Sequence, residues 1–239
     1  MPGGVYVALS GMRTRLDALD RLSSDIANSG TAGYKAERSS NAEATRSPFA
    51  GVLDSAIDVT TGTRRLNATA GAIAPTGRNL DVAVEGDGFL VVQSPAGVRY
   101  TRNGHLQVRT DGVLTTDDGA VVQGANGPIK VGTGKVEVGQ DGTVQVSGAV
   151  VGKLSVVKFD DPGTLVREGA SLLRGDPAKA QPVTLPSVRG GSLEQSNVSV
   201  VERIAELTDV MRTFEALQKA LTLQMNDIDG RAIDTLGRR

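Results

Sequence analysis

Apolar residues recur at alternating steps of three and four positions near both ends of the chain. The N-terminal row passes through one polar residue, Ser23, and the C-terminal row passes through Gln218. A repeat of about 3.5 residues predicts long helices whose narrow apolar faces suit packing against other long helices. The predicted assembly seam consists of Val5, Leu9, Met12, Leu16, Leu19, Ile26, Ile204, Leu207, Met211, Phe214, Leu221, Met225 and Ile228.

The expected helices have sequence signals at their limits. Asn28, Gly30 and Gly33 are stop signals after the first row, and Ser199 with Glu202 forms a capping box before the second. Burial of six large apolar side chains contributes at most about 10–18 kcal/mol. Ordering the backbone costs about 1–2 kcal/mol per residue. We therefore expect the helices to pair with each other or with those of other subunits, and to be disordered before that. Docking of each helix on its own domain is the alternative.

The middle of the chain carries short apolar runs separated by turn dipeptides. Val82 and Val84 alternate with other residues, and Val144 and Val146 repeat the pattern further along. Asp-Gly and Asn-Gly pairs favour the tight turns of β-hairpins because both residue types tolerate positive φ. These pairs begin at Asp87, Asn103, Asp111, Asp118, Asn126 and Asp141. We therefore expect the middle of the chain to be an antiparallel β domain.

Together these patterns predict an α+β fold. An antiparallel β-rich central domain, residues 80–160, is flanked by long N- and C-terminal helices that pair as a coiled-coil-like module. Residues 1–35 and 192–239 form that discontinuous helical module. Residues 36–79 and 161–191 contain many Ser, Thr, Ala, Gly and Pro residues with little periodicity, so they are expected to be extended connectors.

The composition limits the chemistry of the chain. Its 239 residues include no Cys, no Trp, one His, three Tyr and four Phe. A disulfide framework, a thiolate nucleophile and a multi-histidine metal site are therefore excluded. The net charge of −1 gives no basic footprint for nucleic acid or for a membrane anchor. No apolar run reaches the roughly 18 residues of a membrane span, and the N-terminus has no pattern of a cleaved secretory signal.

Individual motifs do not assemble into a catalytic site. Asp81, Glu85 and Asp87 are close in sequence, but nothing fixes two of them at a glycosidase separation, and turns explain the Gly residues beside them. Lys135 is not followed by Ser or Thr as in a phosphate-binding loop. The single His105 follows the Asn-Gly turn and is expected to be an exposed surface residue. We therefore expect no catalytic, cofactor-binding or metal site, and no enzyme.

Four segments in order carry a family resemblance. They are Asp25 to Lys35, with Ala-Asn followed by Thr-x-Gly-Tyr-Lys; Asn79 to Phe89; the hairpin that opens with Tyr100-Thr-Arg-Asn-Gly104; and Ser192 to Val198. They resemble the motifs of the flagellar basal-body rod and hook protein family. The residues that match are Asn28, Thr31, Gly33, Tyr34, Lys35, Asn79, Leu80, Asp81, Gly86, Gly88, Phe89, Tyr100, Thr101, Arg102, Gly104, Leu193, Glu194, Ser196 and Asn197. The sequence departs from the family pattern at Ser24-Asp25, in a shortened stretch between residues 41 and 79, and in a basic tail at Gly237-Arg-Arg.

The resemblance implies a structural subunit of the rod that polymerises through its terminal helices into the hollow drive shaft. A single β domain is most like the proximal-rod type. The implied partners are copies of itself, neighbouring rod proteins and the flagellar type III export apparatus, with no nucleic acid, no membrane insertion and no cofactor. The implied location is the basal body outside the cytoplasmic membrane, which is the periplasm of a two-membrane cell, after export without a cleaved signal. The alternatives are a distal-rod or hook subunit, or a soluble β-domain carbohydrate-binding protein or enzyme.

Overall fold

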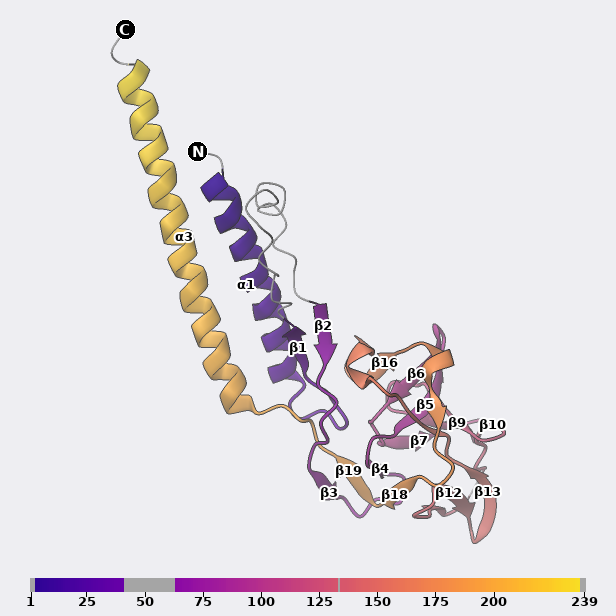
Figure 1. The fold of residues 1–239 in the computed structure, drawn as a ribbon. Coiled ribbons are helices and arrows are strands. Elements are labelled where there is room, and N and C mark those ends of the chain that lie inside the picture. The colour runs from indigo at the N-terminus through magenta and orange to yellow at the C-terminus, as the bar shows by residue number, and fades with distance from the viewer. Residues whose placement is uncertain (1–2, 41–62, 133, 237–239) are drawn as a thin grey trace. The chain divides into compact units, whose positions relative to one another are not determined.

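The computed structural model describes residues 3–40, 63–132 and 134–236, and the chain divides into two compact units (Figure 1). Unit 1 comprises residues 1–27, 39–63 and 199–239. Unit 2 comprises residues 28–38 and 64–198. Each unit therefore collects segments that are far apart in the sequence.

In the part of unit 1 that the structure describes there are two long helices, α1 over Gly3–Ala27 and α3 over Val200–Leu236. No Pro occurs within either helix, and α3 has its acidic residue Glu202 in the first turn, where the helix dipole favours negative charge. The helices touch: a Cβ added at Gly11 would lie 3.6 Å from a methyl carbon of Leu217. Near the other end of α1, Asp25 Oδ2 lies 3.4 Å from Arg203 Nε.

The predicted pairing of these helices as a coiled coil is wrong. Of the side chains described between 200 and 223 of α3, none is fully buried, and the seam residues Ile204 and Met211 are 50% and 49% exposed. On α1, Leu9 and Leu16 are 57% and 48% exposed. A coiled coil would bury these positions in holes on the partner helix.

The sequence pattern misled because two adjacent apolar rows run along α3. The half-buried row, which includes the Leu217 that faces α1, lies next to the predicted one and shares part of it. Its apolar members are Leu207, Val210, Phe214, Leu217 and Leu221. Of the other seam residues, Met12, Leu19 and Ile26 are half-buried, whereas Val5, Met225 and Ile228 lie outside the residues whose side chains are described.

Unit 2 is built from short strands and two 3-10 helices. The strands that lie wholly within it are β3 Ile73–Pro75, β4 Val82–Glu85, β5 Phe89–Ser94, β6 Gly97–Thr101, β7 Leu106–Val108, β8 Leu114–Thr116, β9 Val121–Gly124, β10 Gly127–Pro128, β11 Val136–Val138, β12 Thr143–Val146, β13 Ala149–Lys153, β14 Val156–Lys158, β15 Val166–Glu168, β16 Leu172–Arg174, β17 Gln181–Pro182, β18 Ser187–Gly190 and β19 Ser192–Glu194. The 3-10 helices are η2 Pro162–Thr164 and η3 Pro177–Lys179. β1 Glu37–Ser40 pairs with β2 Thr63–Leu66 where the two units join in sequence.

The β-rich centre is antiparallel, as predicted. Its ten-stranded sheet runs β15-β16-β6-β5-β9-β8-β7, with β10 paired to β9 and β14 paired to β5 and β17. β11, β12 and β13 form a second sheet, and β18 with β4 and β19 with β3 form two-stranded pairs. Strands β1 to β3 and β15 to β18 lie in segments expected to be extended connectors. The domain boundaries themselves stay a prediction.

Two apolar clusters form the core of unit 2. The larger one collects inward-facing aliphatic residues of the strands, among them Leu90, Leu106 and Leu114, each 0% exposed. The smaller one is aromatic: the ring of Tyr100 meets that of Phe159 edge-on, with centroids 4.8 Å apart. These clusters hold the strands that carry the polar site described next.

Candidate functional site

Residues from three of the sequence motifs meet inside unit 2. Lys35 is the last residue of the N-terminal motif, Arg102 follows β6, and Glu194 ends β19. The side chains of all three are at most 2% exposed. We call Lys35, Arg102 and Glu194 the buried ion cluster. Because charged side chains are almost never fully buried without partners, the cluster has to be held by specific contacts.

Glu194 is the centre of the cluster. Its Oε1 accepts a hydrogen bond from Lys35 Nζ at 2.5 Å, and its Oε2 accepts one from Arg102 Nη1 at 3.0 Å. Burial lowers the pKa of Lys35, while the charge and hydrogen bond of Glu194 act in the opposite direction. Removing one partner from such a buried group leaves an uncompensated charge and costs several kcal/mol. The carboxylate therefore keeps two buried cations in place.

Backbone carbonyls accept further hydrogen bonds from the two cations, whereas the buried Arg102 Nε has no hydrogen-bond partner. Lys35 Nζ also donates to the carbonyl of Thr69 at 2.7 Å. Arg102 Nη1 donates to Val84 O at 3.0 Å and Nη2 to Gly86 O at 2.5 Å. The guanidinium carbon of Arg102 lies 5.0 Å from the centre of the Phe89 ring, a cation–π distance. The cluster thus fixes backbone on several strands as well as balancing charge.

Main-chain contacts join the N-terminal and C-terminal motifs directly. Gly33 N donates to Glu194 O at 2.7 Å, and Ala36 N donates to Asn197 Oδ1 at 2.8 Å. Asn197 Nδ2 in turn donates to Asn67 O at 2.8 Å. One Asn side chain therefore bridges two segments that have no strand pairing with its own.

Gly33 is at a position that no other residue fits. Its φ is +68°, in the left-handed region that favours glycine. A Cβ there would lie 2.2 Å from the carbonyl carbon of Arg102. The glycine lets the N-terminal motif lie directly on the Arg102 backbone.

Sequence reasoning missed Arg167, which holds the same segment from the other side. Its guanidinium carbon lies 4.7 Å from the Tyr34 ring centre, and its Nη2 lies 3.2 Å from Glu37 Oε2. Arg167 lies on β15, in a stretch expected to be a connector, where no periodic signal marked it. Only the positive charge of Arg167, directly after the apolar residues Leu165 and Val166, could have pointed to it.

The structure places the other motif residues around this site in supporting roles. Thr31 Oγ1 donates to Asn28 Oδ1 at 3.2 Å, and Thr101 Oγ1 donates to Ser171 O at 2.7 Å. Asp81, 3% exposed, lies 3.0 Å from His105 Nδ1. The remaining motif residues are structural. Leu80 and Phe89 contact the apolar clusters, Tyr100 belongs to the smaller cluster, and Leu193 pairs with Ala74. Ser196 Oγ accepts from Val198 N, Asn79 lines a shallow surface depression, Gly86 has a φ of +77°, and a Cβ at Gly88 or Gly104 would clash.

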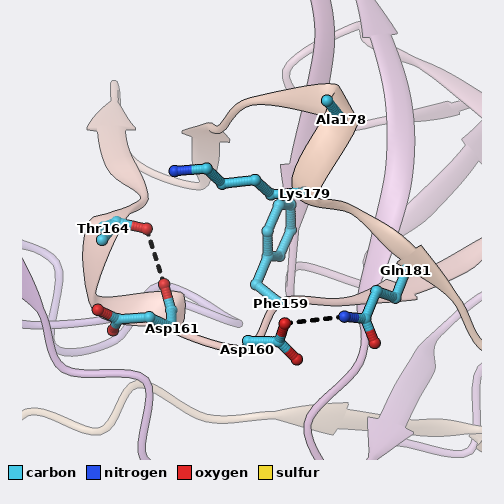
Figure 2. A pocket seen from close by; sticks show the side chains of 7 residues that line it. All are labelled: Phe159, Asp160, Asp161, Thr164, Ala178, Lys179 and Gln181. Carbon is cyan, nitrogen blue, oxygen red and sulfur yellow. Dashed lines mark hydrogen bonds between the residues drawn. The ribbon is translucent and has the colours of Figure 1, made fainter.

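A cavity of about 470 Å³ lies elsewhere on unit 2, and Figure 2 shows the side chains that line it. Asp160 accepts from Gln181 Nε2 at 2.9 Å, and Asp161 accepts from Arg65 Nη2 at 2.6 Å. The hydrogen bond from Arg65 is the main cause of a lowered pKa of Asp161. A general acid needs a raised pKa, so Asp161 does not have the electrostatics of the acid in a glycosidase site.

The described residues offer no centre for metal binding or membrane insertion. Within 3–40, 63–132 and 134–236, no three His, Cys, Asp or Glu residues are grouped so that they could hold a metal ion. In the same ranges, no helix has both the length and the apolar character of a membrane span.

Comparison with known proteins places the chain. The family model for the flagellar hook protein FlgE/F/G D1 domain matches residues 83–146, and the model for the flagellar basal body rod FlgEFG protein C-terminal region matches 189–234. The flagellar basal-body rod protein FlgF of Caulobacter vibrioides is 34% identical over 251 aligned positions, covering 100% of this chain and 99% of the relative. The chain belongs to the flagellar basal-body rod protein family.

Other relatives cover nearly the whole chain as well. FlgF of Salmonella typhimurium is 33% identical, covering 97% of both chains, and FlgG of Bacillus subtilis is 29% identical, covering 91% of this chain and 93% of the relative. This is a family of structural rod proteins and not of enzymes. Arg102 lies in the region matched by the first family model, and Glu194 lies in the region matched by the second. The buried ion cluster thus joins both matched regions.

Proposed function

We propose that this chain is a structural subunit of the bacterial flagellar basal-body rod, located in the basal body and assembled with other rod components. Relatives that align over the whole chain carry the name of basal-body rod proteins, which supports this proposal. The observation that carries it is the buried ion cluster, a site in which ion pairs and hydrogen bonds connect backbone segments far apart in the sequence. Such a site suits a protein whose task is to hold its form under load.

The site lies on the path by which force enters unit 2. The chain first passes from unit 1 to unit 2 after residue 27, leaves unit 2 for residues 39–63, and returns to unit 1 for the last time after residue 198. Residues 33–36, just inside the first passage, are bonded to Glu194 and Asn197, just before the last. Force applied through either covalent connection is therefore shared between both segments and passed to the strands that Arg102 contacts. This is how a rod subunit transmits torque without chemistry.

Exposed apolar residues on the helices support an assembly role for unit 1. Leu9, Leu16, Ile204 and Met211 are each about half exposed, and long helices that leave such residues in water gain free energy when another chain covers them. In our proposal these seam residues contact other copies of this chain and neighbouring rod proteins. A repeated contact that does not close into a ring generates a tubular filament.

The finer parts of the proposal concern export and location. We propose passage through the flagellar type III export apparatus without a cleaved signal, and final placement outside the cytoplasmic membrane, in the periplasm of a two-membrane cell. Helices with few fully buried side chains cost little to unfold for such a passage.

The assembly role is tested in a strain whose chromosomal copy lacks residues 1–28. We expect no motility and no complete rods by electron microscopy of isolated basal bodies, with full rescue by the wild-type gene on a plasmid. Normal rods and motility in the deletion strain would overturn the proposal.

Rescue with point variants separates assembly from folding. We expect Ile204→Asp with Met211→Asp to fail in rescue although the protein is made in normal amounts, because charges then occupy the proposed contact. The matched control is Ala220→Asp, which adds a charge to an exposed position on the opposite side of α3 and should rescue. Equal rescue by both variants would contradict a role for the seam.

The position along the axis distinguishes the proximal-rod proposal from its alternative within the family. A distal-rod or hook subunit would carry an epitope tag at a different height in isolated basal bodies. Gold labelling of a tagged, functional copy is expected to mark the rod segment nearest the cytoplasmic membrane.

A further inference from the structure

Residues 191–198 form the last segment of unit 2, and we call them the C-terminal strap. Its only strand, β19, pairs with β3 over three residues, from Ser192 opposite Pro75 to Glu194 opposite Ile73. Gln195 N adds a hydrogen bond to Ala72 O at 2.8 Å. A two-stranded pair of this length is marginal by itself, so other contacts must hold the strap closed.

The apolar core does not supply those contacts. Among the described residues, neither apolar cluster of unit 2 includes a member of the strap. The strap instead buries polar groups: Ser192 is 4% and Glu194 is 1% exposed. Its attachment therefore depends on hydrogen bonds and charge, and its opening would leave the packing of the two apolar clusters in place.

The strap is also one of the parts that hold the N-terminal segment of unit 2, beside Arg167 and the Thr69 carbonyl. Lys35 and Glu194 are 159 positions apart in the sequence, and Ala36 and Asn197 are 161 apart. When the strap is open, Lys35 and Arg102 lose their shared carboxylate and their charges repel each other. Residues 33–36 then lose the partners of Gly33 N and Ala36 N as well. Opening of the strap therefore removes several contacts of residues 33–36 together, and those that remain include the hydrogen bond from Asn67 N to Ala36 O and the contact of Arg167 with the Tyr34 ring.

We propose that the C-terminal strap is a latch, locked by Glu194, that opens together with residues 33–36 while the sheets of unit 2 stay folded. The latch makes the attachment of the N-terminal segment conditional on nearly the whole chain being present. It also lets both connections to the helices loosen in one step. The latch is a property of the purified chain, and it stands whether or not the chain is a rod subunit.

The experiment uses single-cysteine reporters, which is clean because the chain has no Cys of its own. Ala36→Cys places a thiol at a 0% exposed position beneath the latch, and Ala120→Cys places one at a 2% exposed position in the larger apolar cluster. The rate of labelling by a soluble thiol reagent is measured for each reporter in the full chain and in chains that also carry Glu194→Gln. Glu202→Gln, at an exposed residue of α3, is the matched control.

We expect Glu194→Gln to raise the labelling rate at position 36 by about 100-fold and to leave the rate at position 120 nearly unchanged, because a buried ion pair has lost one charge. Glu202→Gln should change neither rate. Equal acceleration at both positions would show global unfolding and overturn the latch, and so would no acceleration at position 36.

A milder variant keeps the test decisive if Glu194→Gln does not fold. Asn197→Ala removes the acceptor for Ala36 N but leaves all three charges of the buried ion cluster in place. We expect it to raise labelling at position 36 by about tenfold, the effect of losing one or two buried hydrogen bonds, again without a change at position 120. Labelling of both reporters at the wild-type rate in this variant would overturn the proposal.

Discussion

The two units of this chain treat charged and apolar side chains in opposite ways. Unit 2 buries Lys35, Arg102 and Glu194 almost completely and gives each of them partners. Unit 1 leaves large apolar residues such as Leu16 and Ile204 about half exposed on its helices. Unit 2 is thus specified by contacts inside the chain, whereas unit 1 leaves apolar surface that other chains cover in the proposed assembly.

The largest loss of stability is expected from adding a side chain at Gly104, where the backbone of unit 2 leaves no room for another atom. A Cβ at Gly104 would lie 1.6 Å from the carbonyl oxygen of Val82, whose backbone N donates to Gly104 O. We expect Gly104→Ala to destabilise unit 2 by more than about 4–5 kcal/mol, so that little folded protein is recovered. The measurement is circular dichroism and urea unfolding of the purified chain.

The control for this variant is Gly30→Ala, because a Cβ at Gly30 would meet nothing within 4 Å. We expect its free energy of unfolding to stay within about 0.5 kcal/mol of the wild type. A normally folded Gly104→Ala chain would show that the close approach of these backbones is not required.

The next effect concerns the buried ion cluster. Arg102→Met fills similar space but leaves Glu194 with one cation and removes the donors to Val84 O and Gly86 O. We expect it to lower the free energy of unfolding by about 3–5 kcal/mol. Arg102→Lys should cost less, because it keeps the charge while losing the fork geometry of the guanidinium. Chemical denaturation of the three proteins gives the ranking.

Replacing a surface Arg with Met shows whether burial causes the loss of stability expected for Arg102→Met. Arg174 pairs with Glu168 at 2.9 Å, but the side chain of Arg174 is 58% exposed. Arg174→Met is expected to cost at most about 1 kcal/mol. If both Met variants were equally destabilised, the contrast between buried and exposed pairs would fail.

A pair of leucines compares the two units directly. Leu114 is 0% exposed in the larger apolar cluster of unit 2, and Leu16 is 48% exposed on α1. Leu114→Ala should cost about 2–5 kcal/mol by losing apolar contacts and leaving a cavity. Leu16→Ala should change the free energy of unfolding of the monomer by less than about 0.5 kcal/mol, since Ala is a better helix former and little burial is lost.

The assembled state would sharpen this comparison. If Leu16 is covered by other subunits, its replacement should weaken assembly although the monomer is unaffected. Sedimentation of wild-type and variant polymers at equal concentration measures this difference. A large loss of monomer stability for Leu16→Ala would mean that Leu16 already stabilises unit 1 in the absence of other chains.

The sequence predicted the elements of both units better than the contacts that hold them. Helices at both ends follow from spacing and from the absence of Pro, and turn dipeptides located several hairpins. Gly112, Gly119 and Gly142, for example, have positive φ between strands, as the Asp-Gly pairs suggest. Gly104 differs, because its backbone lies directly against that of Val82. Its neighbour Asn103 is buried and bonded to Asp117. Local propensity does not distinguish these two uses of glycine.

Contacts over long sequence separations could not be predicted. The resemblance to family motifs picked out Lys35, Arg102 and Glu194, but nothing in their local sequence indicates that one carboxylate would bind both cations. Arg167 was not marked at all. On α3, two neighbouring apolar rows have the same spacing, so periodicity cannot decide which one faces α1. In each case a partner elsewhere in the chain decides the outcome.

The smallest expected effect is at an exposed ion pair of unit 2, and it tests whether charge pairing without burial contributes to the fold. Hydrogen bonds from Arg109 are the main cause that lowers the pKa of Asp111 to about 2. Because the pKa is lowered in the folded chain, this pair stabilises the fold above the ordinary Asp pKa of about 3.8, and the contribution is lost as the pH falls toward 2. Arg109→Ala should raise the pKa of Asp111 toward 3.8 in an NMR titration while barely changing stability at neutral pH.

The pKa of Asp141, which is lowered chiefly by Thr143, should not move and is the internal control. A wild-type Asp111 pKa near 3.8 would contradict the pairing, and a large loss of stability in Arg109→Ala would show that exposed pairs help to hold unit 2 as the buried ion cluster does.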